Sequence, residues 1–278
     1  MRNHRVRVSP LPPWLPARQL LGPGRWRLSA LPGCDALAAQ ADLPATAAAD
    51  LGARLRGVGL AGHVLVIEID PALPRSVVRT ARLAEARRLR AGSAGFSRSG
   101  TRLDAEARRS LTPEALALAL GRRARGAHVL DAACGAGGNA IGFARAGCRV
   151  TALELDAGRL AMARANARVY GVADRIRFIA GDALELVPGL PADLLFVDPP
   201  WGERYDKRRT VLADLPLLEQ LLARGTRCER VWAKVPPSFD PGSMMAGARA
   251  RAVFGVGEGD ARRVKFLVLE LAQQPVDP

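Results

Sequence analysis

The chain has 278 residues, of which 49% are hydrophobic and 24% charged, and its formal net charge is +14. This length can bury one α/β core and leave a smaller appendage, and no stretch reaches the roughly 18 uninterrupted apolar residues of a membrane span. Prolines and basic residues in residues 1–16 argue against a signal peptide, so we expect a cytoplasmic protein without a membrane partner.

The composition also bears on metals, disulfides and polyanions. The four cysteines form no CxxC pair and the three histidines do not stand at metal-ligand spacing, so we expect neither a disulfide nor a metal site. The positive charge suits RNA, whose phosphates would be met by an arginine-rich surface. Alternatively, the excess of arginine, alanine and glycine reflects the base composition of the gene. Nothing in the sequence indicates an oligomeric state.

The N-terminal part predicts a small α/β extension. Residues 1–57 carry no chemical motif, and the pieces at residues 35–40 and 44–56 are predicted to be helical. Residues 62–70, GHVLVIEID, alternate apolar and polar side chains and stop at Pro71, which predicts a half-buried strand.

A basic region connects this part to the rest of the chain. Residues 75–90 have apolar side chains at helical spacing, with arginines on the remaining face. Between residues 75 and 125 there are thirteen arginines and four acidic residues, which form either a basic approach to an active site or a solvated helix face with loops. Residues 91–101 contain three glycines and predict a flexible connector. We therefore assign residues 1–100 to the extension and 101–278 to the main domain.

The main domain alternates strand and helix patterns. Thr112 is predicted to cap a helix that begins at Pro113. Helices are also predicted from Gly137 to about residue 146, from Asp156 to about residue 170, and over residues 211–222. Strands are predicted at residues 128–133, 149–155, 176–180, 194–197 and 231–235, mostly without polar alternation, as expected for a sheet covered on both faces.

The end of the chain decides between two fold families. Residues 251–256 and 264–271 flank GEGD, a turn signal, and predict an antiparallel hairpin. That ending is typical of class I methyltransferases and atypical of dehydrogenases. We therefore predict an α/β, Rossmann-like class I methyltransferase fold, with a seven-stranded, mostly parallel sheet that ends in an antiparallel hairpin.

A glycine-rich loop follows the first strand of this domain. Residues 135–140, GAGGNA, fit a dinucleotide fingerprint, which does not by itself separate NAD from S-adenosylmethionine. The glycines allow a close approach of the backbone, and the helix start after them favours a carboxylate. Asp131 favours S-adenosylmethionine, because it would face the donor's ammonium group. Alternatively, Asp131 only bonds the backbone of the loop.

Two further carboxylates end the next two strands. Glu154 stands where a carboxylate accepts from ribose hydroxyls in either cofactor class. Asp182 could accept from the exocyclic amino group of adenine, or could simply cap the short helix predicted from Ala183.

The most specific motif is Asp198-Pro199-Pro200-Trp201, which follows the fourth strand. A planar amino group is a poor nucleophile because its lone pair is delocalised. The Asp198 carboxylate and the Pro199 carbonyl would hold its hydrogens and stabilise positive charge as a methyl group transfers. Trp201 would stack on the ring that carries the amino group. We assign these four residues to catalysis; the alternative is a structural Pro-Pro turn.

At this point the sequence resembles the catalytic domain of trimethylguanosine synthases, the RNA cap guanine-N2 methyltransferase family. The likeness lies in VLDAACGAGGNAIGFA, VTALELD, ANARVYGVADRIRFIAGD and FVDPPWG, and RLDAEARRSLTPEALA resembles the preceding segment. The resemblance implies that Trp201 stacks on the acceptor purine and that four residues contact the donor: Thr112, Asp131, Glu154 and Asp182. The full set assigned to the cofactor is Thr112, Asp131, Cys134, Gly135, Gly137, Gly138, Asn139, Glu154, Leu155, Asp182 and Ala183.

The sequence departs from this family at two positions. Eukaryotic members typically have serine where Asp198 stands and glycine where Glu203 stands, so Asp198 brings the site closer to bacterial amino methyltransferases. We predict an S-adenosylmethionine-dependent N-methyltransferase acting on an exocyclic amino group, guanine-N2 of an RNA. The alternatives are adenine-N6 or cytosine-N4 methylation of nucleic acid, methylation of a glutamine amide or small heterocycle, and a catalytically idle donor-binding subunit that presents a basic surface to RNA.

Overall fold

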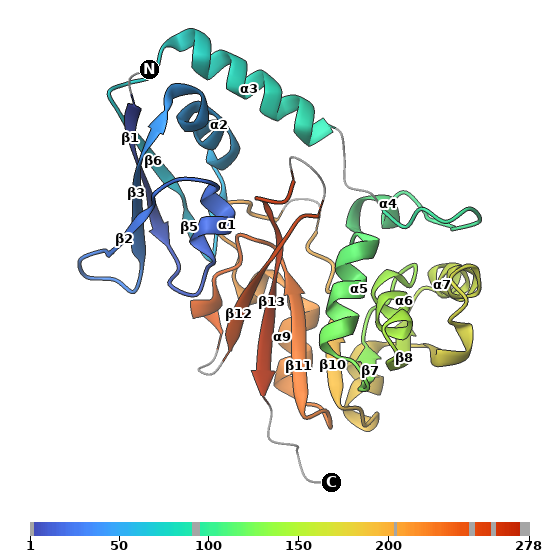
Figure 1. The fold of residues 1–278 in the computed structure, drawn as a ribbon. Coiled ribbons are helices and arrows are strands. Elements are labelled where there is room, and N and C mark those ends of the chain that lie inside the picture. Colours follow the sequence, from blue (N-terminus) through green and yellow to red (C-terminus); the bar gives the residue numbers. More distant parts are fainter. Residues whose placement is uncertain (1–2, 91–94, 203–204, 245–247, 257–259, 273–278) are drawn as a thin grey trace.

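A computed structural model of the chain describes residues 3–90, 95–202, 205–244, 248–256 and 260–272. It contains a four-stranded and a seven-stranded sheet, and the long helix α3 runs from the first toward the helices that cover the second (Figure 1). None of the described helices is both long and apolar enough to cross a membrane.

The N-terminal unit is an antiparallel sheet in the order β2-β3-β1-β6, on which α2 packs, and α3 packs on α2. Its elements are β1 (Asn3–Leu11), α1 (Ala17–Leu21), β2 (Arg27–Ala30), β3 (Leu37–Pro44), α2 (Ala45–Leu55), β4 (Gly59–Leu60), β5 (His63–Val64), β6 (Val66–Asp70) and α3 (Arg75–Arg90). The helices predicted at residues 44–56 and 75–90 are confirmed.

The helix predicted at residues 35–40 is wrong, because β3 occupies most of that stretch. Val6 of β1 pairs with Ala41 of β3, and Ala39 and Ala41 are buried in the core. Pairing with β1 therefore overrides the helix propensity of the alanines. The strand predicted at residues 62–70 is divided into β5 and β6 at Leu65, which is buried.

The main sheet has the order β12-β13-β11-β10-β7-β8-β9, with β13 antiparallel to both neighbours. Its strands are β7 (His128–Asp131), β8 (Arg149–Glu154), β9 (Ile176–Ala180), β10 (Leu194–Val197), β11 (Arg230–Val235), β12 (Arg249–Phe254) and β13 (Val264–Ala272). Its helices are α4 (Ala107–Ser110), α5 (Glu114–Arg123), α6 (Gly138–Arg145), α7 (Ala157–Val169), α8 (Ala183–Leu186) and α9 (Pro216–Arg224). The seven-stranded sheet and the C-terminal hairpin confirm the predicted class I methyltransferase fold.

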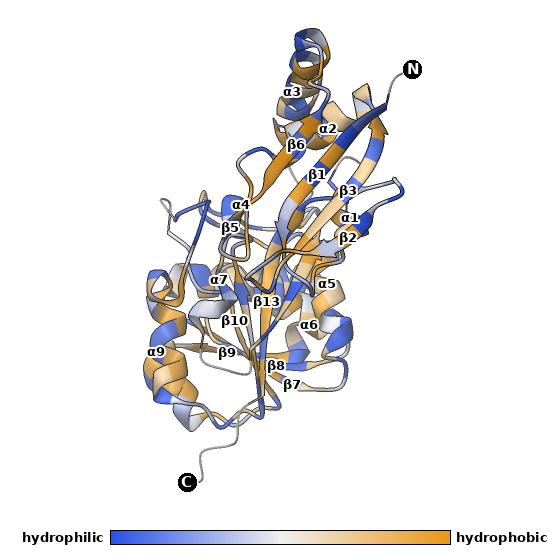
Figure 2. Ribbon diagram, turned by 90° about the vertical axis from the view of Figure 1, so that its left-hand side faces the viewer, coloured by the Kyte–Doolittle hydropathy of each residue, from blue (hydrophilic) through white to orange (hydrophobic). Residues whose placement is uncertain are grey.

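Apolar strands separate helices α5 and α6 from α9, as Figure 2 shows. One hydrophobic cluster joins α5, α6 and α7 to one face of the sheet, and the other joins α9 and the N-terminal unit to the opposite face. Because β7 and β10 are neighbours and the chain leaves them in opposite directions, their carboxyl ends border the crevice in which doubly wound sheets bind ligands.

Some of the predicted helix ends differ from those in the structure. Thr112 is not an N-cap: α5 begins at Glu114 after Pro113, whose carbonyl accepts from the backbone of Leu116, and no side chain caps the helix. The helix predicted at residues 211–222 is interrupted before Pro216, which disfavours helical geometry in the preceding residue. Residues 91–94 of the connector and 257–259 of the GEGD turn lie outside the described residues.

The two units also meet through backbone contacts. Ala61 and Gly62, between β4 and β5, donate to the carbonyls of Pro237 (2.9 Å) and Ser238 (3.2 Å), just after β11. A side chain at Gly59 would collide with the Lys207 carbonyl, at 2.3 Å. The N-terminal unit therefore supports the loops at the carboxyl end of the main sheet.

Candidate active site

The glycine turn after β7 has a backbone that favours glycine. Gly135 (φ 54°) and Gly137 (φ 88°) lie in the left-handed region, and Gly137 precedes α6. A Cβ at Gly137 would also approach the Ala163 Cβ of α7 to 3.1 Å. The turn is held by Glu154, whose carboxylate accepts from the Gly135 amide at 2.8 Å.

Asp131, at the end of β7, is fully buried, and no side chain donates a hydrogen bond to its carboxylate; the hydrogen-bond donor that acts on it is the backbone amide of Ala133. Burial, followed by the negative charge of Asp198, raises the pKa of Asp131 to about 8. The Ala133 amide and the charge of Lys234 offset this only in part, so a cationic ligand beside Asp131 would stabilise its ionised form.

Two more buried polar atoms near the glycine turn have no hydrogen-bond partner among the described residues. They are the hydroxyl of Thr112, before α5, and the amide oxygen of Asn139, in the first turn of α6. Both belong to segments around the carboxyl end of β7, where Asn139 also donates to Asp198. Donor and acceptor groups are therefore left for a polar ligand on several sides of the crevice.

The remaining residues assigned to the cofactor differ in burial and in their hydrogen bonds. Glu154 is buried, and its second oxygen accepts from the Asp156 amide at 2.9 Å. Asp182 caps α8 by accepting from the Leu184 amide at 2.8 Å, as the alternative interpretation predicted. Leu155 is 72% exposed, which leaves an apolar side chain uncovered beside the strand end. Three others have little exposure and pack into the core: Cys134, Gly138 and Ala183.

Asp198 follows β10 and is mostly buried, with 16% of its side chain exposed. Its Oδ2 accepts from Asn139 Nδ2 at 2.8 Å and from Lys234 Nζ at 2.7 Å. Its Oδ1 makes no hydrogen bond to a described residue. Asp198 therefore has one oxygen held by the protein and one open to a ligand.

Trp201 is partly buried between the two hydrophobic clusters. Its indole N–H donates to the Lys234 carbonyl at 3.4 Å, and its ring meets that of Tyr205 edge-on, with the centroids 5.7 Å apart. Pro199 is buried and Pro200 exposed, and Glu203 lies outside the described residues. The indole is thus held by the hydrogen bond of its N–H and by the ring of Tyr205.

Lys234, in β11, is the residue of this site that the sequence interpretation missed. It is 4% exposed and stands in the otherwise apolar sequence VWAKV. A charge in a buried central strand requires a partner, and Lys234 is one of three lysines in the chain, so a signal was present.

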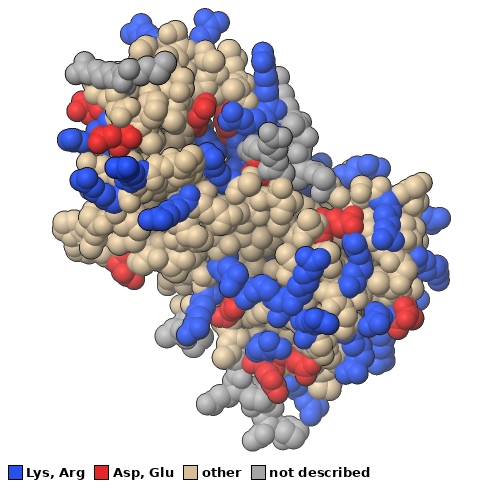
Figure 3. Space-filling model, in the orientation of Figure 1, with Lys and Arg blue, Asp and Glu red and all other residues tan. Residues whose placement is uncertain are grey.

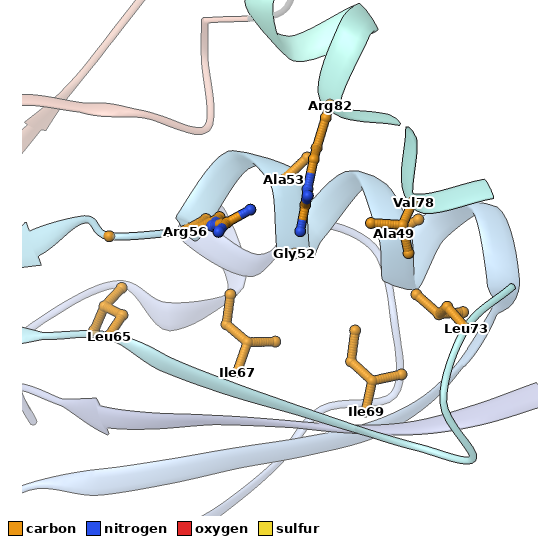
Figure 4. A pocket seen from close by; sticks show the side chains of 11 residues that line it. Ala49, Gly52, Ala53, Arg56, Leu65, Ile67, Ile69, Leu73, Val78 and Arg82 are labelled. Carbon is orange, nitrogen blue, oxygen red and sulfur yellow. The ribbon is translucent and has the colours of Figure 1, made fainter. Parts of the chain in front are cut away.

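A separate apolar hollow of about 280 Å³ lies in the N-terminal unit and shares no residue with the crevice. Figure 4 shows the side chains of Ile67 and Ile69 facing α2, with Arg56 and Arg82 near the opening. In the part of the chain that the structure describes, no three His, Cys, Asp or Glu residues are grouped to hold a metal ion.

Basic side chains are spread over the face drawn in Figure 3 and are not gathered in one stripe. Some arginines of residues 75–125 serve the fold: Arg98 lies over the Tyr170 ring, and Arg123 pairs with Glu270 at 2.7 Å. Others remain exposed on α3 and α4, among them Arg79, Arg87 and Arg108. Some of these arginines thus make contacts within the fold, and others lie on a solvated helix face.

Comparison with known proteins agrees with this geometry. Residues 126–218 match the family described as RNA cap guanine-N2 methyltransferase. The matched residues include the glycine turn, Glu154 and the DPPW loop. Trimethylguanosine synthase of Schizosaccharomyces pombe is 37% identical over 128 residues, which cover 42% of this chain and 53% of that protein.

Two further proteins are similar to this chain. Ribosomal RNA small subunit methyltransferase J of Rhodopseudomonas palustris is 36% identical over 145 residues, covering 45% of this chain and 65% of that protein. An RNA methyltransferase of Salinibacter ruber, solved with S-adenosyl-L-homocysteine, is 21% identical with a TM-score of 0.41, covering 60% of this chain and 97% of that one. The chain thus spans only 53% and 65% of the lengths of the two curated relatives.

The cofactor of this family, S-adenosylmethionine, fits the residues present. Its methionyl ammonium would stabilise the ionised form of the buried Asp131 carboxylate. Asn139 and Thr112 offer further unpaired polar atoms, and the glycine turn leaves room for a close approach of the ligand.

Proposed function

We propose that this methyltransferase transfers a methyl group from S-adenosylmethionine to the exocyclic N2 amino group of guanine in an RNA. The observation that carries the proposal is the geometry of Asp198, which has one oxygen fixed and the other open, beside the indole of Trp201. The match of residues 126–218 to the guanine-N2 family supports the choice of base.

On the donor side, Asp131 would pair with the ammonium group. Glu154 already accepts one backbone N–H at each oxygen, and a carboxylate oxygen has a further lone pair with which to accept from a ribose hydroxyl. Asp182 can cap α8 through one oxygen and accept from the adenine amino group through the other. Leu155 would cover an apolar face of the adenine. When bound, the donor supplies a methyl group on a positively charged sulfur.

On the acceptor side, the DPPW residues orient the base and prepare its nitrogen. Trp201 would stack on the purine, and Asp198 Oδ1 and the Pro199 carbonyl would accept the two hydrogens of the amino group. These bonds strengthen as the nitrogen becomes positive, so they favour the transition state over the bound substrate. After the methyl transfer the nitrogen carries one proton too many, and it would pass that proton to the Asp198 carboxylate, which already accepts one of its hydrogens.

The remainder of the substrate would be held by exposed arginines. Arg79 and Arg87 lie on α3, and Arg108 lies on α4, which ends at Ser110. The Ser110 carbonyl lies 3.5 Å from Lys234 Nζ, so α4 ends beside the crevice. We infer that residues 101–278 form the catalytic domain, and that the extension of residues 1–100 contributes RNA contacts through α3.

The test supplies labelled donor with total RNA, DNA and protein as separate acceptors, followed by nucleoside analysis of the labelled fraction. We expect label in RNA as N2-methylguanosine. Label in N6-methyladenosine, N4-methylcytidine or a protein amide would contradict the acceptor assignment. Asp198→Ala is the control, and it should lower kcat by about 10- to 150-fold while leaving donor affinity in place, because a bond to a charged acceptor is worth about 1.5 to 3 kcal/mol.

A further inference from the structure

Lys234 makes more contacts than a simple ion pair needs. Its Nζ donates to Asp198 Oδ2 at 2.7 Å and lies 3.5 Å from the Ser110 carbonyl. The same atom is 5.3 Å from the ring centroids of Trp201 and of Phe266. One buried ammonium thus contacts the DPPW carboxylate, the DPPW indole and the segment that leads to Thr112.

The sheet register explains why these residues meet. In the parallel pair β10 and β11, Val197 is opposite Ala233, so Asp198 and Lys234 are the next residues along the two strands. Lys234 follows Trp232 by two residues, so both side chains point to the same side of the sheet, the one covered by α5 and α6. Asn139, in the first turn of α6, completes the group by donating to the same oxygen of Asp198.

A buried ammonium and a buried carboxylate each depend on the other. Removing one partner of such a pair leaves an uncompensated charge, whereas replacing both by neutral groups is far less harmful. Described groups that act on Asp198 are Lys234 from β11, Asn139 from α6 and Asp131 from β7, and Tyr205 lies beyond Trp201.

We propose that Lys234 is a positioning residue for methyl transfer, which holds Oδ2 of the Asp198 carboxylate so that Oδ1 is open to the acceptor amino group. This inference rests on the proposed function only in that Asp198 must accept from an amino group. It does not depend on which base carries that group.

The test is the pH dependence of single-turnover methyl transfer at saturating donor in Lys234→Met, which keeps an apolar side chain but removes the charge. Without the ammonium, Asp198 should protonate at a higher pH, so the rate should fall by about tenfold or more between pH of about 8.5 and 6.5, beyond any change in the wild type. In the double variant Lys234→Met with Asp198→Asn, neither residue 198 nor residue 234 has an ionisable side chain. Its extra pH dependence should vanish, and its rate should match that of Asp198→Asn alone.

Folding is followed separately by the melting temperatures of the same four proteins. The double variant should melt higher than Lys234→Met, because it contains no unpaired buried charge. Arg123→Met is the matched control: Arg123 also joins a carboxylate, Glu270, to an aromatic ring, Trp232, but on α5 away from the DPPW loop. It should keep the wild-type pH profile.

The inference is overturned if Lys234→Met keeps the wild-type pH profile, or if its extra pH dependence persists in the double variant. If Lys234→Met does not fold, a double variant that is much slower than Asp198→Asn overturns it instead. When label reaches an amino acceptor other than guanine, the proposed function fails, and the rates are measured on that acceptor. If the wild type transfers label to no acceptor, the proposed function and the inference about Lys234 both fail.

Discussion

Asp131 is the residue whose surroundings should change most when the donor binds. Its pKa is raised to about 8 by burial and by the charge of Asp198, so the carboxyl is mostly protonated at pH 7. A donor ammonium favours the ionised form and lowers the pKa in the complex. Binding of S-adenosylhomocysteine near pH 7 should therefore release close to one proton, and affinity should rise between pH of about 6 and 7.5, by at most about tenfold per pH unit.

Calorimetry in buffers of different ionisation enthalpy measures that proton directly. Asp131→Asn should bind the ligand more weakly and release no proton, and equal proton release by both proteins would remove Asp131 from the donor site.

The pH dependence of the stability of the free protein gives an independent check. Because the folded pKa is above the ordinary value of 3.8, the stability of the free protein should fall as pH rises from about 4 to 8. The Asn variant should lack this loss and melt higher than the wild type at pH of about 8.

Trp201 is expected to act on the acceptor and not on the donor. Loss of a stacking platform costs about 1 to 3 kcal/mol per base, so Trp201→Ala should weaken RNA binding by about 5- to 150-fold. Trp201→Phe keeps a ring but loses the N–H bond to the Lys234 carbonyl, and should keep most of the affinity. Fluorescence anisotropy of labelled RNA measures both. Equal affinity of the wild type and the Ala variant would exclude stacking.

At the scale of elements, the packing of α5 on α6 sets the donor crevice. A Cβ at Gly142 would lie 2.5 Å from the Ala117 carbonyl carbon, and one at Gly121 would lie 2.5 Å from the Gly142 carbonyl oxygen. The two helices approach this closely only because both positions are glycine. Thr112 lies before α5 and Asn139 lies in α6, so the helix separation also places their unpaired polar atoms.

Gly142→Ala should therefore be destabilising, although alanine has the higher helix propensity by about 1 kcal/mol. The overlap with the α5 backbone outweighs that gain, and we expect a net loss of about 1 to 3 kcal/mol together with weaker donor binding. Gly189→Ala is the control, because a Cβ there meets nothing within 4 Å. Urea unfolding compares the two, and equal midpoints would refute the close packing.

At the scale of the whole molecule, net charge and architecture act together. The formal charge of +14 favours RNA association at any surface, whereas α3 and α4 would guide it toward the crevice. The contacts of Ala61 and Gly62 with the loop after β11 connect the N-terminal unit to the active-site end of the main sheet. The extension and the catalytic domain should therefore hold one RNA between them.

This arrangement predicts how salt affects the reaction. KM for RNA should rise steeply with salt while kcat changes little. Each phosphate that an arginine contacts on a single strand adds about 0.7 to the slope of log KM against log salt concentration. The pair of changes Arg79→Gln and Arg87→Gln on α3 should lower that slope by about 1 to 2. Two exposed arginines before and within the edge strand β9 provide the control pair, Arg175→Gln and Arg177→Gln. Equal slopes for both pairs would leave α3 without a role in RNA binding.

The sequence by itself determined the main domain, because the signals there are local. Apolar runs without alternation marked the parallel strands, Asp156 capped α7 as expected, and the carboxylates at strand ends fell at one edge of the sheet. Local signals failed where long-range pairing decided: residues 35–40 became part of β3 through β1, and Thr112 was buried instead of capping α5.

Only the tertiary structure showed which side chains of the candidate site contact one another. Asp198 and Lys234 are 36 residues apart in sequence, and they meet because β10 and β11 are in register. That no side chain donates a hydrogen bond to Asp131 is likewise invisible in a motif, since it depends on which groups from other strands fail to reach it. Motifs record which groups a strand end carries, but the charge of each group is set by its neighbours across the sheet, and those are fixed only when the chain folds.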